Sequence, residues 1–407
     1  MGKKKKIERE HPFEKLKRRD GNPFDEATVK NWYVARAYVL DKLRKEVVSP
    51  DSNKSMKIVV EIDGDKELML SVVRQVALSA HFPNYVEYDA LGRLSRKNHT
   101  VVEVVTRDQN IDQELKKEQY LNNLLVFCQY TKNKVDQNKS DHLLPIDIDF
   151  DIVESASSEG EDVVLMTCED VKAFLCSKDD AEIYGIDTRM AVLSGRVYDL
   201  GVEIDNLPYE DIHDARRYNR ALNVFQYKLL PKKIGKLMDE KWDNNPIKVK
   251  NGLSNIFCAD RFISVEDGIK EYCENKQKKL DCGKDGVSEE SCWEENDFQL
   301  AVSEHTRWVV EKLILGFRPM NCKERARYGS LFGNQRKAYA NMLKGDPRRL
   351  LKTFPEDYDD EHIDPTHINL CTFGELRRVD PDNRRYDSFL MLAIPKIIKK
   401  IEKDDKK

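Results

Sequence analysis

The chain has 407 residues, of which 40% are hydrophobic and 35% are charged, with a formal net charge of -4. This length and hydrophobic content allow two or three domains with folded cores, and the mixing of basic and acidic residues gives no reason to expect a nucleic-acid partner. Because no run approaches the roughly 18 apolar residues of a spanning helix and the N-terminus lacks the apolar stretch of a signal peptide, we expect a protein without a membrane span.

The nine cysteines predict no metal site and no disulfide framework. Their number is odd, and no two of them are spaced C-x-x-C. A zinc site needs short paired spacings. We therefore expect reduced thiols in a cytoplasmic protein.

The first part of the chain is predicted to be a tail followed by a helix. Residues 1–24 are charged and rich in turn formers, whereas residues 27–46 carry apolar side chains at helical spacing. A polar break around Pro50 ends this region, so residues 1–55 are assigned to an N-terminal tail and helix.

Strands and helices then alternate. Runs typical of strands lie near residues 57–62, 100–106, 143–150 and 162–167, and patterns typical of helices lie at 68–80, 113–131, 190–200 and 211–230. This alternation predicts a Rossmann-like α/β domain with a parallel, doubly wound sheet. We place it at residues 56–240 and treat 241–297 as a connecting segment.

The turn after the first predicted strand contains Gly64 between Asp63 and Asp65. A dinucleotide fingerprint needs G-x-G-x-x-G, so that a diphosphate can approach a helix N-terminus. With one glycine among acids that repel a diphosphate, we predict no NAD in a standard cradle here. The candidate cofactor contacts of this half are Asp63, Gly64 and Asp108, the last at the end of the second strand; the residues do not identify a cofactor. The alternative is a degenerate scaffold used for dimerisation.

From residue 298 the chain is predicted to be helix-rich. Three separated blocks are notable: Glu304-His305-x-x-Trp308 with a helical run to Gly316-Phe317; His367-Ile-Asn369-Leu370 before Phe373 and Leu376; and Tyr386-Asp387 before Ile394-Pro395. Their order resembles the repeat domain of ryanodine receptors (the RyR domain) and its bacterial relatives. Phe317 stands where the family has a second tryptophan, and the family's proline after His367 is absent. The resemblance implies a mostly α-helical RyR-type domain at residues 298–402.

In that family the tryptophan is associated with stacking on an adenine base, and nearby basic residues with phosphates. The resemblance therefore implies ligand contacts from His305, Trp308, Lys312, Arg318 and Asn369. Helical spacing places the first three on one helix face, and an indole can stack on a purine. The alternative is that His305 and Trp308 pack in a core and that Lys312 is a solvated surface residue.

Some bacterial relatives join this domain to a nucleotide-binding Rossmann domain of the potassium-channel regulatory type. In bacterial relatives an Asn-Arg helix precedes the RyR domain, and Asn219-Arg220-Ala221 resembles that helix. The resemblance implies a homo-oligomeric regulator that senses an adenine-nucleotide-like ligand, in bacterial nucleotide signalling or defence against phage. No Ser-His-Asp, Cys-His or H-E-x-x-H pattern is present, so no catalytic residue is predicted. Two alternatives stay open: an enzyme acting on a nucleotide or NAD-like substrate, with Asp63, Asp65 and Asp108, and a non-catalytic assembly scaffold.

Overall fold

The computed structural model describes residues 26–88, 91, 93–107, 119–128, 146–156, 163–178, 295–314, 316–345 and 366–380, together with isolated positions between 257 and 272. Several expectations fall outside these residues: Asp108, the helices predicted at 190–200 and 211–230, and the block that begins at Tyr386. No helix among the described residues combines the length and apolar character needed to cross a bilayer.

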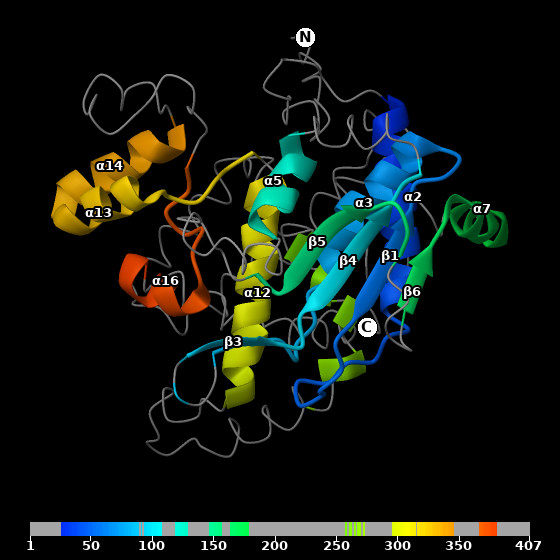
Figure 1. The fold of residues 1–407 in the computed structure, drawn as a ribbon, viewed down its shortest axis with the longest axis horizontal. Helices are drawn as coiled ribbons and strands as arrows, with labels where there is room; N and C mark the ends of the chain where they lie inside the picture. The colour runs from blue at the N-terminus through cyan, green and yellow to red at the C-terminus, as the bar shows by residue number, and fades with distance from the viewer. Residues whose placement is uncertain are drawn as a thin grey trace, which may run out of the picture.

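A four-stranded parallel sheet lies at the centre (Figure 1). Its strands are β1 (Lys57–Glu61), β4 (Thr100–Val105), β5 (Ile148–Val153) and β6 (Val163–Met166), in the spatial order β5-β4-β1-β6. Counted along the chain this is the order 3-2-1-4, which is that of the first four strands of a doubly wound dinucleotide-binding sheet. The predicted parallel α/β sheet is confirmed.

The two faces of the sheet differ in chemistry because side chains alternate along a strand. Ile58, Val60, Val102 and Val104 belong to the main core. This core also includes residues of α2 (Glu26–Leu43), α3 (Lys66–Ser79) and α5 (Gln119–Phe127). The opposite face carries the buried ion pair of Lys57 and Glu103, whose charged atoms are 3.2 Å apart.

A short hairpin, β2 (Val86–Tyr88) and β3 (Leu94–Lys97), was not predicted from the sequence. Its strands are short, and Arg96 and Asn98 adopt left-handed backbone angles, with φ of 49° and 57°. The Arg96 guanidinium donates to the carbonyl oxygens of Ile146 (2.7 Å) and Ile148 (3.1 Å) and to Asp149 (2.7 Å). These bonds fasten the hairpin to β5 and offset the cost of the unusual backbone.

The C-terminal helices are arranged around α12 (Glu295–Ile314), which packs against α3 and α5. On its other side lie α13 (Cys322–Ser330), α14 (Gly333–Gly345) and α16 (Phe373–Val379), as Figure 1 shows. Leu300, Val309, Val310 and Leu313 of α12 belong to the same core as the sheet. The predicted domain boundaries stay a prediction; the described parts of the two regions share one continuous core.

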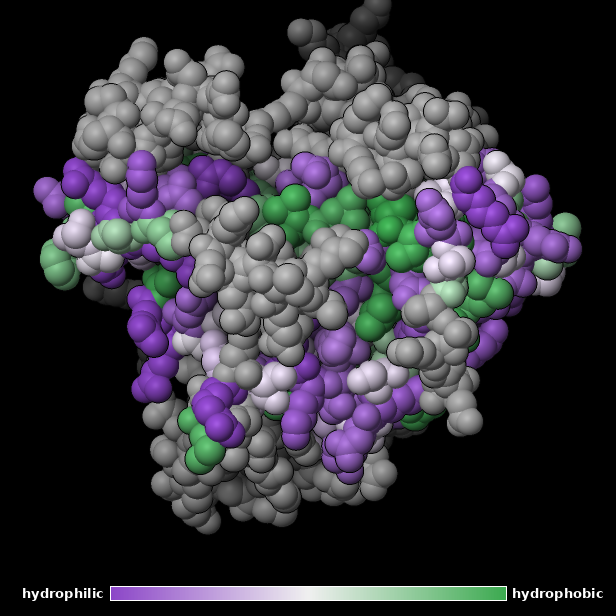
Figure 2. Space-filling view, in the orientation of Figure 1, coloured by the Kyte–Doolittle hydropathy of each residue, from purple (hydrophilic) through white to green (hydrophobic). Residues whose placement is uncertain are grey.

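The remaining helix, α7 (Cys168–Ser177), follows β6 and is capped by Thr167, whose hydroxyl accepts the N–H of Asp170 at 3.1 Å. In Figure 1 it lies at the edge of the sheet far from α13 and α14. Figure 2, in the same orientation, shows hydrophobic residues gathered over the sheet and mainly hydrophilic residues at α13 and α14.

Candidate functional site

Trp308 is the one residue between Ala301 and Leu313 of α12 that is not buried. Its inner side packs against the main core, while the rest of the indole reaches the surface. The other side chains of this stretch are held in the interior of the protein. The helix therefore presents one large aromatic surface at a fixed place.

Two histidine rings contact the Trp308 indole. The His305 ring lies nearly parallel to it, with an interplanar angle of 18° and centroids 6.1 Å apart. The His367 ring meets it edge-on, with centroids 4.9 Å apart, and also contacts Phe317 at 5.8 Å. Because a carbonyl oxygen can only accept, His305 Nε2 carries the hydrogen of its 2.9 Å bond to the Cys371 carbonyl. The predicted proximity of His305 and Trp308 on one helix face is present in the structure.

Lys312 is buried rather than solvated. Its Nζ lies 5.1 Å from the centroid of the Trp308 ring and forms an ion pair with Glu311. Burial alone raises the pKa of Glu311, but Lys312 and Arg307 together lower that pKa below its ordinary value. The ammonium group is thus held over the indole by a charged carboxylate and by the ring itself.

Asn369 brings an acceptor with no partner to this site. Its Nδ2 donates to Asp380 Oδ2 at 3.1 Å, and its backbone N–H donates to His367 Nδ1 at 3.3 Å. Since the Asp380 carboxylate accepts, the amide oxygen Oδ1 points elsewhere; it is buried, and no group among the described residues donates to it. An unpaired buried acceptor costs about 1–3 kcal/mol, so a donor from a ligand would be favourable there.

Arg318 is connected to the site through its backbone. Its carbonyl accepts the N–H of His367 at 3.1 Å, while its guanidinium pairs with Glu324 of α13 at 2.8 and 2.9 Å. The Arg318 side chain therefore joins α13 to the site, and its backbone carbonyl positions His367. Of the predicted ligand residues, His305 and Lys312 each contact Trp308, Asn369 joins them through His367, and Arg318 supports His367 through its backbone.

Two further residues were not predicted as ligand contacts. His367 belongs to the motif His367-Ile-Asn369-Leu370, and its position two residues before Asn369 was the sequence feature that could have indicated a place in the site. Lys344 of α14 has no such signal, because it lies far from Lys312 in the chain. The Thr366 N–H donates to the Leu343 carbonyl at 2.9 Å, which brings this end of α14 next to His367. Partial burial and the charge of Lys312 lower the pKa of Lys344.

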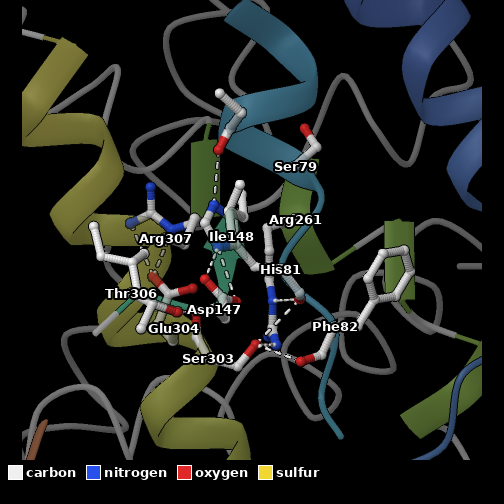
Figure 3. Close-up of polar contacts among 12 residues, drawn as sticks. Ser79, His81, Phe82, Asp147, Ile148, Arg261, Ser303, Glu304, Thr306 and Arg307 are labelled. Carbon is white, nitrogen blue, oxygen red and sulfur yellow. Dashed lines mark hydrogen bonds and ion pairs between the residues drawn. The ribbon is translucent and has the colours of Figure 1, made fainter. Parts of the chain in front are cut away.

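A buried polar network fixes α12 to the α/β region (Figure 3). Ser303 Oγ is bonded to the carbonyl oxygens of His81 and Phe82, each at 3.1 Å, and accepts from Arg261 at 2.6 Å. His81 Nδ1 in turn lies 2.9 Å from Asp147 Oδ1, at the start of β5.

One turn further along α12, Arg307 pairs with Glu304 and Glu311, each at 2.9 Å. All three side chains are buried, and Lys312, which also pairs with Glu311, supplies the second positive charge that balances the two carboxylates inside the protein. The network sets the position of the helix that carries Trp308.

The first α/β turn is closed by its own side chains. Asp65 Oδ1 accepts the Leu68 N–H at 3.1 Å and caps α3, and Asp63 Oδ1 accepts the Cys168 N–H at 3.0 Å at the start of α7. Gly64 has φ 63°, and a Cβ there would lie 3.0 Å from Cys168 Sγ. This point between β1 and β6 is where doubly wound sheets bind ligands. The absence of a standard NAD cradle stays a prediction, which this geometry supports.

Comparison with family models, curated proteins and solved structures finds no match to this chain. The resemblance to the ryanodine-receptor repeat domain thus rests on the sequence blocks described above.

Proposed function

We propose that the protein is a regulator that senses an adenine-nucleotide-like small molecule at the Trp308 site. The observation that carries the proposal is the buried Asn369 Oδ1, which has no donor among the described residues. It lies in a loop that also supplies His367 to the indole. The RyR-type assignment and a Rossmann-like role for the sheet are part of this proposal.

The chemistry of the site fits a purine with an attached phosphate. A base can stack on the exposed part of the indole, and an exocyclic amine can donate to Asn369 Oδ1. Lys312 and Lys344 supply positive charge from two helices. Lys312 Nζ is bound to Glu311, and an ammonium group has three hydrogens, so it can bind a phosphate oxygen while keeping Glu311.

A connected set of contacts leads from this site to the sheet. His305 binds the Cys371 carbonyl, and the adjacent N–H groups of Phe373 and Gly374 donate to Glu87 of the β2–β3 hairpin at 3.1 and 3.2 Å. Arg96 ties that hairpin to β5. Ligand at Trp308 therefore has a physical connection to the α/β region, as a sensor requires.

The decisive experiment is calorimetric titration of the full chain with ATP, ADP, AMP and NAD, beside thermal melts. Ligand at about 100 times its dissociation constant stabilises the folded state by about 2.7 kcal/mol, which a melt detects. We expect saturable binding of an adenine nucleotide that Asn369→Ala weakens. Failure of every nucleotide to bind the wild type would contradict the proposal, and turnover of ATP or NAD by the pure protein would favour the enzyme alternative.

A further inference from the structure

Helices α13 and α14 form a compact hairpin with an unusual charge. Residues 316–345 contain one acidic side chain, Glu324, and a formal excess of six positive charges, in a chain whose net charge is -4. The basic residues are Arg318, Lys323, Arg325, Arg327, Arg336, Lys337 and Lys344. Whole-chain composition conceals this local concentration.

The one acid of the hairpin contributes no negative surface. Glu324 is fully buried, and its carboxylate binds the Arg318 guanidinium and the Asn321 N–H in the capping box of α13. Lys323 and Lys337, in contrast, are exposed and form no ion pair with the residues that the structure describes. The outer surface of the hairpin is therefore basic.

An aromatic side chain projects from the turn between the two helices. Phe332 is 76% exposed. The Arg336 guanidinium lies 5.7 Å from its ring centroid and 4.9 Å from that of Tyr328. Arg336 also donates to the carbonyl oxygens of Tyr328 (3.2 Å) and Gly329 (3.3 Å), so the turn that displays Phe332 is held in place.

We propose that this α13–α14 hairpin, through Lys323, Phe332 and Lys337, is a docking surface for single-stranded nucleic acid. Lysines neutralise phosphates, and a base can stack on an exposed aromatic ring beside cations. A duplex keeps its bases stacked inside, so the ring favours a single strand. An anionic membrane would also attract the lysines, but Phe332 is the one large apolar side chain exposed among the described residues of this hairpin, which leaves little apolar area to insert into a bilayer.

The test uses the full chain. Binding of labelled single strands of about 15 nucleotides, as DNA and as RNA, is measured by fluorescence anisotropy at several salt concentrations. The matching duplex and phosphatidylcholine–phosphatidylserine vesicles are measured beside them.

We expect the double variant Lys323→Glu/Lys337→Glu to weaken single-strand binding at least about 10-fold at low salt and to reduce the salt dependence, because fewer counterions are released. Phe332→Ala should weaken it about 5- to 150-fold and reduce the preference over duplex. The matched controls are Lys45→Glu/Lys172→Glu, with the same change in charge near α2 and α7, and Leu91→Ala, at a side chain that is also 76% exposed. These controls should bind the strand as the wild type does.

Lys344 is left unchanged because it also lies near the Trp308 site. Nucleotide binding at Trp308 should then be unaffected in every hairpin variant, so the two proposals fail separately. The docking proposal is overturned if the wild type binds no oligonucleotide at low salt, if the controls lose as much affinity as the hairpin variants, or if vesicles bind and oligonucleotides do not. Equal binding of duplex, unchanged by Phe332→Ala, would also overturn it.

Discussion

The first α/β turn and the Trp308 site are both places where a ligand is expected, and they differ in how far the protein satisfies its own polar groups. At the turn, Asp63 and Asp65 bind the N–H groups of Cys168 and Leu68. At the Trp308 site, Asn369 Oδ1 has no described donor and the indole stays partly exposed. Fold topology alone would favour the turn, whereas the balance of donors and acceptors favours the Trp308 site.

The largest effect is expected from loss of the ion pairs that hold α12. Arg307→Leu leaves the buried Glu304 carboxylate without its ion-pair partner and Glu311 with Lys312 alone, which should cost about 3–5 kcal/mol of unfolding free energy. Denaturant titration measures this. Arg325→Leu is the control: it breaks a half-exposed pair with Glu375 and should cost less than about 1 kcal/mol. Equal losses in the two variants would show that the α12 network is not what fixes the site.

The raised pKa of Glu87 should make the stability of the protein depend on pH. Burial raises its pKa to about 7, and the N–H groups of Gly374 and Phe373 offset this only in part. The folded state therefore holds a proton that the unfolded state has lost, so the unfolding free energy should fall as pH rises from about 4.5 to 7, by up to about 3 kcal/mol.

Glu87→Gln should remove most of this dependence while keeping an acceptor for the α16 N–H groups. Glu169→Gln, at an exposed position on α7, should leave the pH profile unchanged. Denaturant titrations at several pH values measure both. A profile that is identical in wild type and Glu87→Gln would contradict the prediction.

Substitutions of Trp308 distinguish a role in nucleotide binding from a role in core packing. Trp308→Ala should weaken nucleotide binding by about 1–3 kcal/mol, or about 5- to 150-fold. Trp308→Phe keeps an aromatic ring in the core and should lose less stability while still binding more weakly than the wild type. Calorimetry and a denaturant melt on each variant measure the two quantities. If both variants lose stability and the wild type binds no nucleotide, Trp308 has a structural role only.

The smallest effect is expected at the closed turn. Gly64→Ala forces a left-handed backbone on a residue with a side chain, which should cost about 1–2 kcal/mol. If the turn has no part in ligand binding, the variant should melt earlier but bind nucleotide as the wild type does. If Gly64→Ala instead loses nucleotide affinity without losing stability, the first α/β turn rather than the Trp308 site would be the place where the ligand binds.

The sequence was sufficient to predict the parallel sheet, because four β-rich runs alternate with helical patterns. It also placed His305 beside Trp308, since a spacing of three residues fixes a helix face. It did not predict the β2–β3 hairpin, because Leu94-Ser95-Arg96-Lys97 has no strong strand pattern and depends on bonds to β5.

Features of the site that depend on distant residues could not be predicted. Spacing places Lys312 near Trp308 but does not show that it is buried against Glu311. The approach of Lys344 and the missing partner of Asn369 arise from chain segments that meet only in the fold. The basic charge of the α13–α14 hairpin is visible in the sequence when the charge is counted locally.

The backbone of Arg96 has a consequence for the order of folding events. Its left-handed conformation is offset by bonds to Ile146, Ile148 and Asp149, which lie about 50 residues later in the chain. We therefore expect the hairpin to reach this conformation after β5 has joined the sheet, and Glu87 to bind the N-terminus of α16 after that. Destabilising substitutions at Arg96 should accordingly accelerate unfolding and leave the refolding rate nearly unchanged, as is typical of contacts formed after the transition state.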